Sequence, residues 1–137
     1  MSEQTPNAEL TSKTELTSND VSALATLVEE WFDLSQAGSA LGVSASRVAQ
    51  LIKDHQLAAA VPVRREGLKV PAGFFADGII VKGVSGIITS LHDGGYDDVQ
   101  ILTWLFTPDD TLPGRPIDAL RENRGAEAKR RAQAMAF

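Results

Sequence analysis

The chain has 137 residues, of which 43% are hydrophobic and 23% are charged, a composition that predicts one soluble globular domain or two small ones sharing a core. It has no cysteine and only two histidines, which excludes disulfide scaffolds, thiolate zinc sites and cysteine nucleophiles. The apolar stretches are far shorter than the roughly 20 residues of a membrane span. The polar, acidic start is unlike a secretory signal, so we expect a cytoplasmic protein without membrane contact.

The net charge of −5 is unevenly distributed along the chain. Residues 31–75 hold five basic and three acidic residues, and residues 115–137 hold six basic and three acidic ones. The two remaining segments are acidic. Segregated charge can create a local basic face on an acidic protein, so the net charge does not exclude a nucleic-acid partner.

Residues 1–19 are predicted to form a disordered acidic tail, because they are rich in serine and threonine and lack aromatic residues. A short repeat, Glu-Leu-Thr-Ser, occurs at residues 9–12 and 15–18. A disordered tail of this kind is accessible to a Ser/Thr protein kinase, and we name Thr11, Thr14 and Thr17 as the candidate phosphorylation sites. The alternative, held about equal, is a solubilising tail with incidental hydroxyls.

Order is expected to begin with a helix capped by Asn19 or Asp20, and its apolar face would hold Leu24, Leu27, Val28 and Trp31. A second helix is expected over residues 35–41, ended by Gly42. A third should run from its cap, Ser44, to about His55, with Val48, Leu51, Ile52 and His55 on one side. Residues 57–63 and 68–70 are then predicted to form the two strands of a hairpin. Phe74 and Phe75 are expected to pack against the same core.

The second half is predicted to be helical again. We expect a helix over residues 84–92 that Gly94-Gly95 ends, and another that starts at Asp97. Residues 107–116 contain three prolines and read as an extended connector, before a short helix over 117–121 and a final one over 126–136. The predicted domains are therefore residues 20–76 and 77–137, after the tail.

Residues 34–51 have the spacing of a helix-turn-helix. Ala37 and Gly38 are small enough for two helices to touch, and Gly42 suits the turn between them. The predicted second helix and the hairpin after it carry the side chains expected to bind DNA. These are Ser44, Ser46, Arg47, Gln50 and Lys53 on the helix, and Arg64, Arg65 and Lys69 on the hairpin, which would act as a basic wing. A purely structural helical hairpin with solvated cations is the alternative.

The sequence also resembles the small actinobacterial winged helix-turn-helix DNA-binding proteins that have a helical C-terminal domain. The matching stretches lie at residues 41–44, 47–52, 70–75, 91–96, 104–109 and 130–137. This resemblance implies a mainly α fold with a small β-hairpin wing and a DNA-binding function in transcription control. The pattern of Trp104, Leu105, Pro108 and residues 116–120 is also similar to the toxin-binding domain of some antitoxins, which implies a partner protein at the C-terminal domain.

No enzyme, cofactor or metal motif is found. Gly83-Val84-Ser85-Gly86 does not have the spacing of a nucleophile elbow, and the adjacent aspartates are better explained as helix caps. The basic residues after position 114 are equally consistent with favourable helix-end charges and with added DNA contact. The most favoured reading is therefore a DNA-binding transcriptional regulator with double-stranded DNA as its partner, and the alternative is an antitoxin-like interaction module. A homodimer is compatible with the sequence, which leaves the oligomeric state open.

Overall fold

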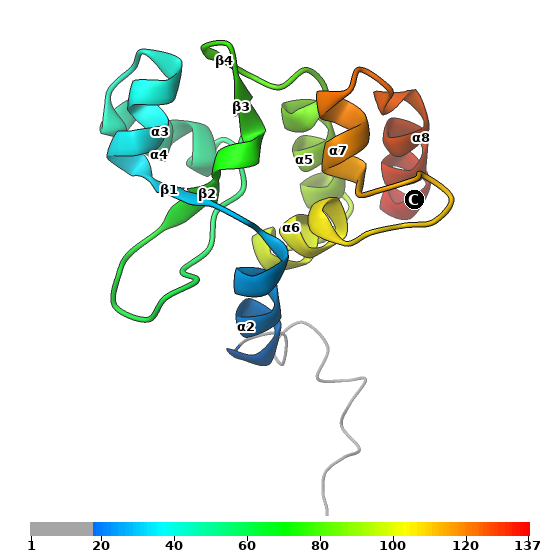
Figure 1. Cartoon of the computed structure of the whole chain (residues 1–137), viewed down its shortest axis with the longest axis horizontal. Coiled ribbons are helices and arrows are strands. Elements are labelled where there is room, and N and C mark those ends of the chain that lie inside the picture. The colour runs from blue at the N-terminus through cyan, green and yellow to red at the C-terminus, as the bar shows by residue number, and fades with distance from the viewer. Residues whose placement is uncertain (1–17) are drawn as a thin grey trace, which may run out of the picture.

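The computed structural model describes residues 18–137, and it is mainly helical with two small antiparallel pairs of strands (Figure 1). The first half holds α2 (Ser18–Leu27), β1 (Trp31–Asp33), α3 (Leu34–Leu41), α4 (Ala45–Lys53) and β2 (Lys69–Pro71). A 3-10 turn, η1 (Ala72–Phe74), leads into β3 (Phe75–Ala76) and β4 (Ile79–Ile80). The second half holds α5 (Val84–Asp93), α6 (Asp98–Phe106), α7 (Pro116–Arg121) and α8 (Gly125–Ala136). The predicted fold class is confirmed, and the predicted tail lies almost wholly outside the described residues.

The first described helix is shorter than predicted. Leu24 and Val28 are buried as expected, but Trp31 belongs to strand β1 and not to the helix face. Strand β1 pairs antiparallel with β2, with Phe32 opposite Val70. The expectation for Trp31 was wrong because its partner strand lies far along the chain, where helical spacing gives no information about it.

The predicted helix-turn-helix is present as α3 and α4. Gly42 takes a left-handed φ of 73°, and a Cβ on Gly38 would come within 2.6 Å of the Val43 carbonyl oxygen. Ser44 caps α4, since its hydroxyl accepts a hydrogen bond from the Arg47 amide at 3.0 Å. Helix α4 ends at Lys53, and His55 lies beyond it with a φ of 59°, so the predicted end was two residues too late.

The predicted strand over residues 57–63 does not form. Only Ala60 pairs with the return strand, through two backbone hydrogen bonds to Lys69. The residues before it are buried, and the Ala59 amide donates to the Asp98 carboxylate instead of to a strand. The wing is therefore the loop of residues 61–68, and β2 joins it to β1.

A second hairpin, β3–β4, was not predicted. Asp77 and Gly78 form its two-residue turn, both with positive φ, and an Asp-Gly pair between apolar residues is a strong local signal for such a turn. The connector after α6 also differs from the extended chain that was expected. It folds back on itself, and Asp109 pairs with Gly114.

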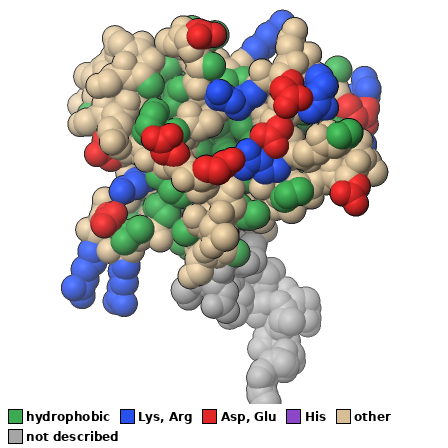
Figure 2. Space-filling model, in the orientation of Figure 1, with side chains coloured by type: hydrophobic (Ala, Val, Ile, Leu, Met, Phe, Trp, Pro, Cys, Tyr) green, Lys and Arg blue, Asp and Glu red, His purple; other side chains and the backbone are tan. Residues whose placement is uncertain are grey.

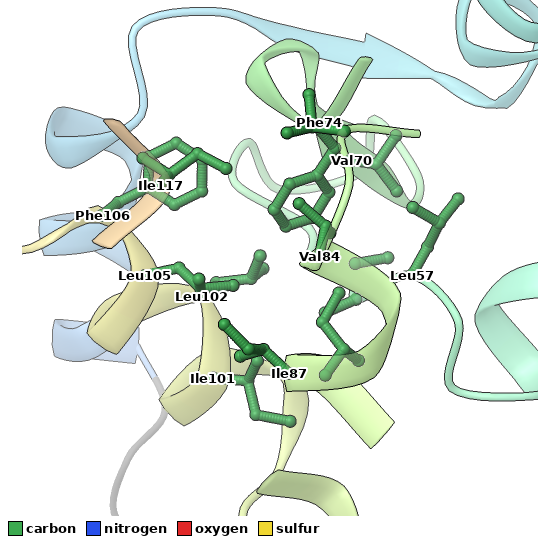
Figure 3. Close-up of a cluster of buried hydrophobic side chains, with 14 of the residues drawn as sticks. Leu57, Val70, Phe74, Val84, Ile87, Ile101, Leu102, Leu105, Phe106 and Ile117 are labelled. Carbon is green, nitrogen blue, oxygen red and sulfur yellow. The ribbon is translucent and has the colours of Figure 1, made fainter. Parts of the chain in front are cut away.

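One hydrophobic core joins the two halves of the chain (Figure 3). Val70 and Phe74 from the first half face Val84 of α5, and Phe74 lies 5.8 Å from the ring of Phe106 in α6. Leu57, just before the wing, is fully buried in the same cluster. The winged helix-turn-helix and the C-terminal helices therefore pack as one body.

Candidate nucleic-acid interface

Helix α4 separates its apolar and polar side chains. Val48 is fully buried and Leu51 and Ile52 are half-buried against the core, which turns the opposite face outward. The predicted DNA-contacting residues Ser46, Arg47, Gln50 and Lys53 are all exposed. This face offers hydroxyl, guanidinium, amide and ammonium groups, the types that contact base edges and phosphates.

The polar side chains of α4 differ in whether they already make hydrogen bonds or ion pairs within the protein. Arg47 and Lys53 make no side-chain ion pair or hydrogen bond with any residue of 18–137. The Gln50 amide donates to the Asp54 carboxylate at 2.9 Å, which leaves its carbonyl oxygen as an acceptor. Ser44 is exposed while it caps the helix. The strongest unpaired groups of this helix are thus its two cations.

The wing carries the other predicted contacts. Arg64 and Arg65 are exposed and have no ion-pair partner in the described part of the chain. Figure 2 shows Lys and Arg side chains reaching outward from the end of this loop. Lys69 differs from both, because its ammonium pairs with the Glu66 carboxylate at 3.0 Å and its side chain is 23% exposed. In Figure 1 the wing and α4 lie on the same side of the molecule, away from α7 and α8.

Most cations of the C-terminal segment are already paired within the fold. Arg115, Arg124, Arg130 and Arg131 make ion pairs with acidic side chains. Arg121 donates hydrogen bonds to the backbone carbonyls of Gly73 and Phe75 at 2.8 and 3.0 Å. Of the six basic residues in 115–137, Lys129 is the one without an ion-pair or hydrogen-bond partner in the part of the chain that the structure describes. The sequence could not reveal this difference between the two basic segments, because it depends on tertiary contacts.

The pKa values of several carboxyl groups are shifted by these internal contacts. Hydrogen bonds from Arg115 lower the pKa of both Glu29 and Asp118. Burial raises the pKa of Asp98, which the hydrogen bond from the Ala59 amide partly opposes. The contacts of Glu29 with Arg115 and of Asp98 with Ala59 join the two halves of the chain, and none of these shifts lies on the exposed face of α4.

Residues 18–137 contain no group of three or more His, Asp or Glu side chains arranged to hold a metal. In the same range, no helix combines the length and the apolar character needed to cross a bilayer.

A helix-turn-helix followed by a loop on a small antiparallel sheet defines a winged helix-turn-helix protein. Residues 18–75 match the family described as "DNA-binding protein Rv2175c, wHTH domain", and residues 81–136 match "Rv2175c C-terminal domain of unknown function". The chain belongs to the Rv2175c family, which confirms the actinobacterial resemblance inferred from the sequence.

Two relatives support this assignment. The DNA-binding protein Rv2175c of Mycobacterium tuberculosis is 42% identical over 123 residues, covering 80% of this chain and 82% of that protein. The NMR structure of Rv2175c is similar with a TM-score of 0.71 and 41% identity, over 80% of this chain and 82% of the other.

Proposed function

We propose that this protein binds double-stranded DNA, with α4 in the major groove and the wing on the phosphate backbone. One observation carries the proposal. Arg47, Lys53, Arg64 and Arg65 are exposed and have no ion-pair partner among residues 18–137, whereas five of the six C-terminal cations are held in internal contacts. Unpaired cations are the groups that can neutralise phosphates and release counterions. The "DNA-binding protein" in the name of the family and of its mycobacterial relative agrees with this.

Each candidate residue has a role that follows from its chemistry. Arg47 and Gln50 can form paired hydrogen bonds to guanine or adenine edges, so we assign them to base recognition. Lys53, Ser44 and Ser46 suit phosphate contacts, as do the wing residues Arg64 and Arg65. Lys69 would have to leave Glu66 before it could bind phosphate, which makes it the weakest of the predicted contacts.

Selection of bound sequences from a random duplex pool with the full chain tests this proposal. The Arg47→Ala variant should bind the selected duplex more weakly by about 1–3 kcal/mol and discriminate less at one base pair. Arg124→Ala is the matched control, since Arg124 pairs with Glu122 and its loss should leave DNA affinity unchanged. Equal affinities of Arg47→Ala and the parent would show that α4 is not the reading helix. The stoichiometry of the complex would separate one bound copy from two.

We further propose that the protein regulates transcription and that phosphorylation of its N-terminal segment by a Ser/Thr kinase weakens DNA binding. The candidates Thr11, Thr14 and Thr17 lie outside the described residues. Each phosphate would add about −1.5 to −2 charge to a segment that is already acidic. The added anions would repel DNA or compete with it for the same cations.

The test compares the parent with a Thr11, Thr14, Thr17→Glu triple variant at two salt concentrations. We expect weaker duplex binding by the triple variant, with the larger difference at low salt, where screening is least. A chain phosphorylated in vitro serves as the second sample, because glutamate carries less charge than phosphate. Unchanged affinity in both samples at low salt would remove the proposed electrostatic control.

A further inference from the structure

Helix α5 carries three polar side chains on one face, at residues 85, 89 and 92, and all three contact the chain just beyond α4. The Ser85 hydroxyl donates to the carbonyl oxygen of Gln56 at 2.7 Å. The Thr89 hydroxyl donates to the carbonyl oxygen of His55 at 3.0 Å. The ring of His92 stacks on that of His55, with 3.4 Å between centroids and 16° between planes. Spacings of four and three residues place such side chains on one side of a helix.

The segment they contact directly follows the proposed reading helix. His55 has a left-handed φ of 59°, as is common for the residue that follows a helix, and its amide and that of Gln56 bond back to the carbonyls of Ile52 and Leu51. The carbonyl groups of His55 and Gln56 lie beyond the last turn of α4, and the two hydroxyls of α5 donate to them. Helix α5 therefore fixes the backbone at the point where α4 ends.

Helix α6 holds the same segment from its other end. The carboxylate of Asp98 accepts a hydrogen bond from the Ala59 amide at 3.0 Å. The next residue, Ala60, makes both backbone hydrogen bonds to Lys69 at the base of the wing. Residues 55–59 thus connect the two elements proposed to contact DNA, and the C-terminal helices hold this connection at both ends.

We propose that the C-terminal domain, described in this family as of unknown function, is a brace that sets the angle between the reading helix and the wing. The proposal rests on the DNA-binding function proposed above. Ser85, Thr89 and His92 are positioning residues, because they reach DNA only through the backbone that they hold. Simultaneous contact of α4 and the wing with one duplex depends on the angle between them. Loss of the contacts that hold this angle should therefore reduce discrimination between the selected duplex and other sequences.

The test uses the full chain and a Ser85→Ala, Thr89→Val double variant. Its affinities for the selected duplex and for a random-sequence duplex are measured at one salt concentration, together with thermal unfolding. We expect the ratio of the two affinities to fall about fivefold or more. A purely structural role would lower the folded fraction and reduce both affinities equally, leaving the ratio unchanged.

A rescue variant and a control variant test whether the change in the affinity ratio comes from the two hydroxyls. Ser85→Thr with Thr89→Ser keeps both hydroxyls and should restore the ratio. Thr103→Val is the matched control, since the Thr103 hydroxyl donates to the Val99 carbonyl within its own helix, α6. If the double variant fails to fold, His92→Ala replaces it, with His92→Phe as the rescue that keeps a stacking ring.

The outcomes separate the two proposals. If the brace variants keep the parent's ratio while Arg47→Ala loses it, the brace is wrong and the reading helix stands. If neither the brace variants nor Arg47→Ala changes the ratio, the brace is wrong and α4 is not the reading helix, whereas the proposed function itself fails only if the parent does not bind duplex DNA.

Discussion

The guanidinium of Arg115 binds both carboxylate oxygens of Glu29, a residue 86 positions earlier in the chain, at 2.9 Å each. The same group binds Asp118 and lies 5.4 Å from the centre of the Phe106 ring. It also donates to the backbone carbonyl of Leu27 at the end of α2. Arg115 therefore ties the first described helix to α7.

Replacing Arg115 with alanine should lower the free energy of unfolding by about 2 kcal/mol, because several hydrogen bonds to charged groups are lost and Asp118 is left partly buried without its partner. Urea unfolding at neutral pH measures the change. Arg130→Ala is the control, since Arg130 is 67% exposed and its pair with Glu127 should contribute less than about 1 kcal/mol. Equal losses in the two variants would contradict a special role for Arg115.

The contact also predicts a pH dependence. Arg115 lowers the pKa of Glu29 below its ordinary value of about 4.3, so the ionised form stabilises the fold above that pH, and the stabilisation is lost as the pH falls through the lowered pKa. The difference in free energy of unfolding between the parent and Glu29→Gln should therefore be largest near neutral pH and shrink as the pH falls below the ordinary pKa of glutamate.

Chemical unfolding of both proteins across this pH range checks the prediction. Glu30→Gln is the control, because it removes a neighbouring exposed carboxylate that does not bind Arg115. A difference that stays constant from neutral to acid pH would show that the ion pair does not stabilise the fold.

Replacing Gly38 with alanine should lower the stability of the fold, whereas replacing Gly86 with alanine should raise it. At Gly38 the new Cβ would come within 2.6 Å of the Val43 carbonyl, so Gly38→Ala should force α3 and α4 apart and cost about 1–3 kcal/mol of stability. At Gly86, within α5, a Cβ meets no atom within 4 Å, and Gly86→Ala should stabilise by about 0.5–1 kcal/mol. Thermal unfolding distinguishes them, and destabilisation by Gly86→Ala would be inconsistent with the open space beside it.

The wing should act through charge alone. If Arg64 and Arg65 contact phosphates, the Arg64→Ala, Arg65→Ala double variant should flatten the slope of log K against log salt by roughly 0.9 for each lost contact. Titrations of one duplex at several salt concentrations give the slope. Arg130→Ala is the control, as an exposed arginine already paired within α8. The same slope in the parent and the double variant would rule out a backbone role for the wing.

The sequence by itself determined the features that depend on neighbouring residues. Gly42 at the turn, Ser44 at the start of α4 and Asp97 before α6 were all predicted correctly, because a cap or a left-handed turn is decided within about four residues. The exposed face of α4 followed from helical periodicity for the same reason. The Asp77-Gly78 turn is equally local, since an Asp-Gly pair between apolar residues favours a two-residue hairpin turn.

Only the tertiary structure decided the rest. Trp31 became a strand residue because β2 offered a partner, and the predicted strand over residues 57–63 did not form, since the Ala59 amide donates to Asp98 of α6 and only Ala60 pairs with Lys69. Free and paired cations look alike in a sequence, so the difference between Arg47 and Arg115 needed the distances to their neighbours. The stacking of His55 on His92 likewise depends on α5 meeting the chain just beyond α4, since burial of the shared core brings together residues that no local pattern connects.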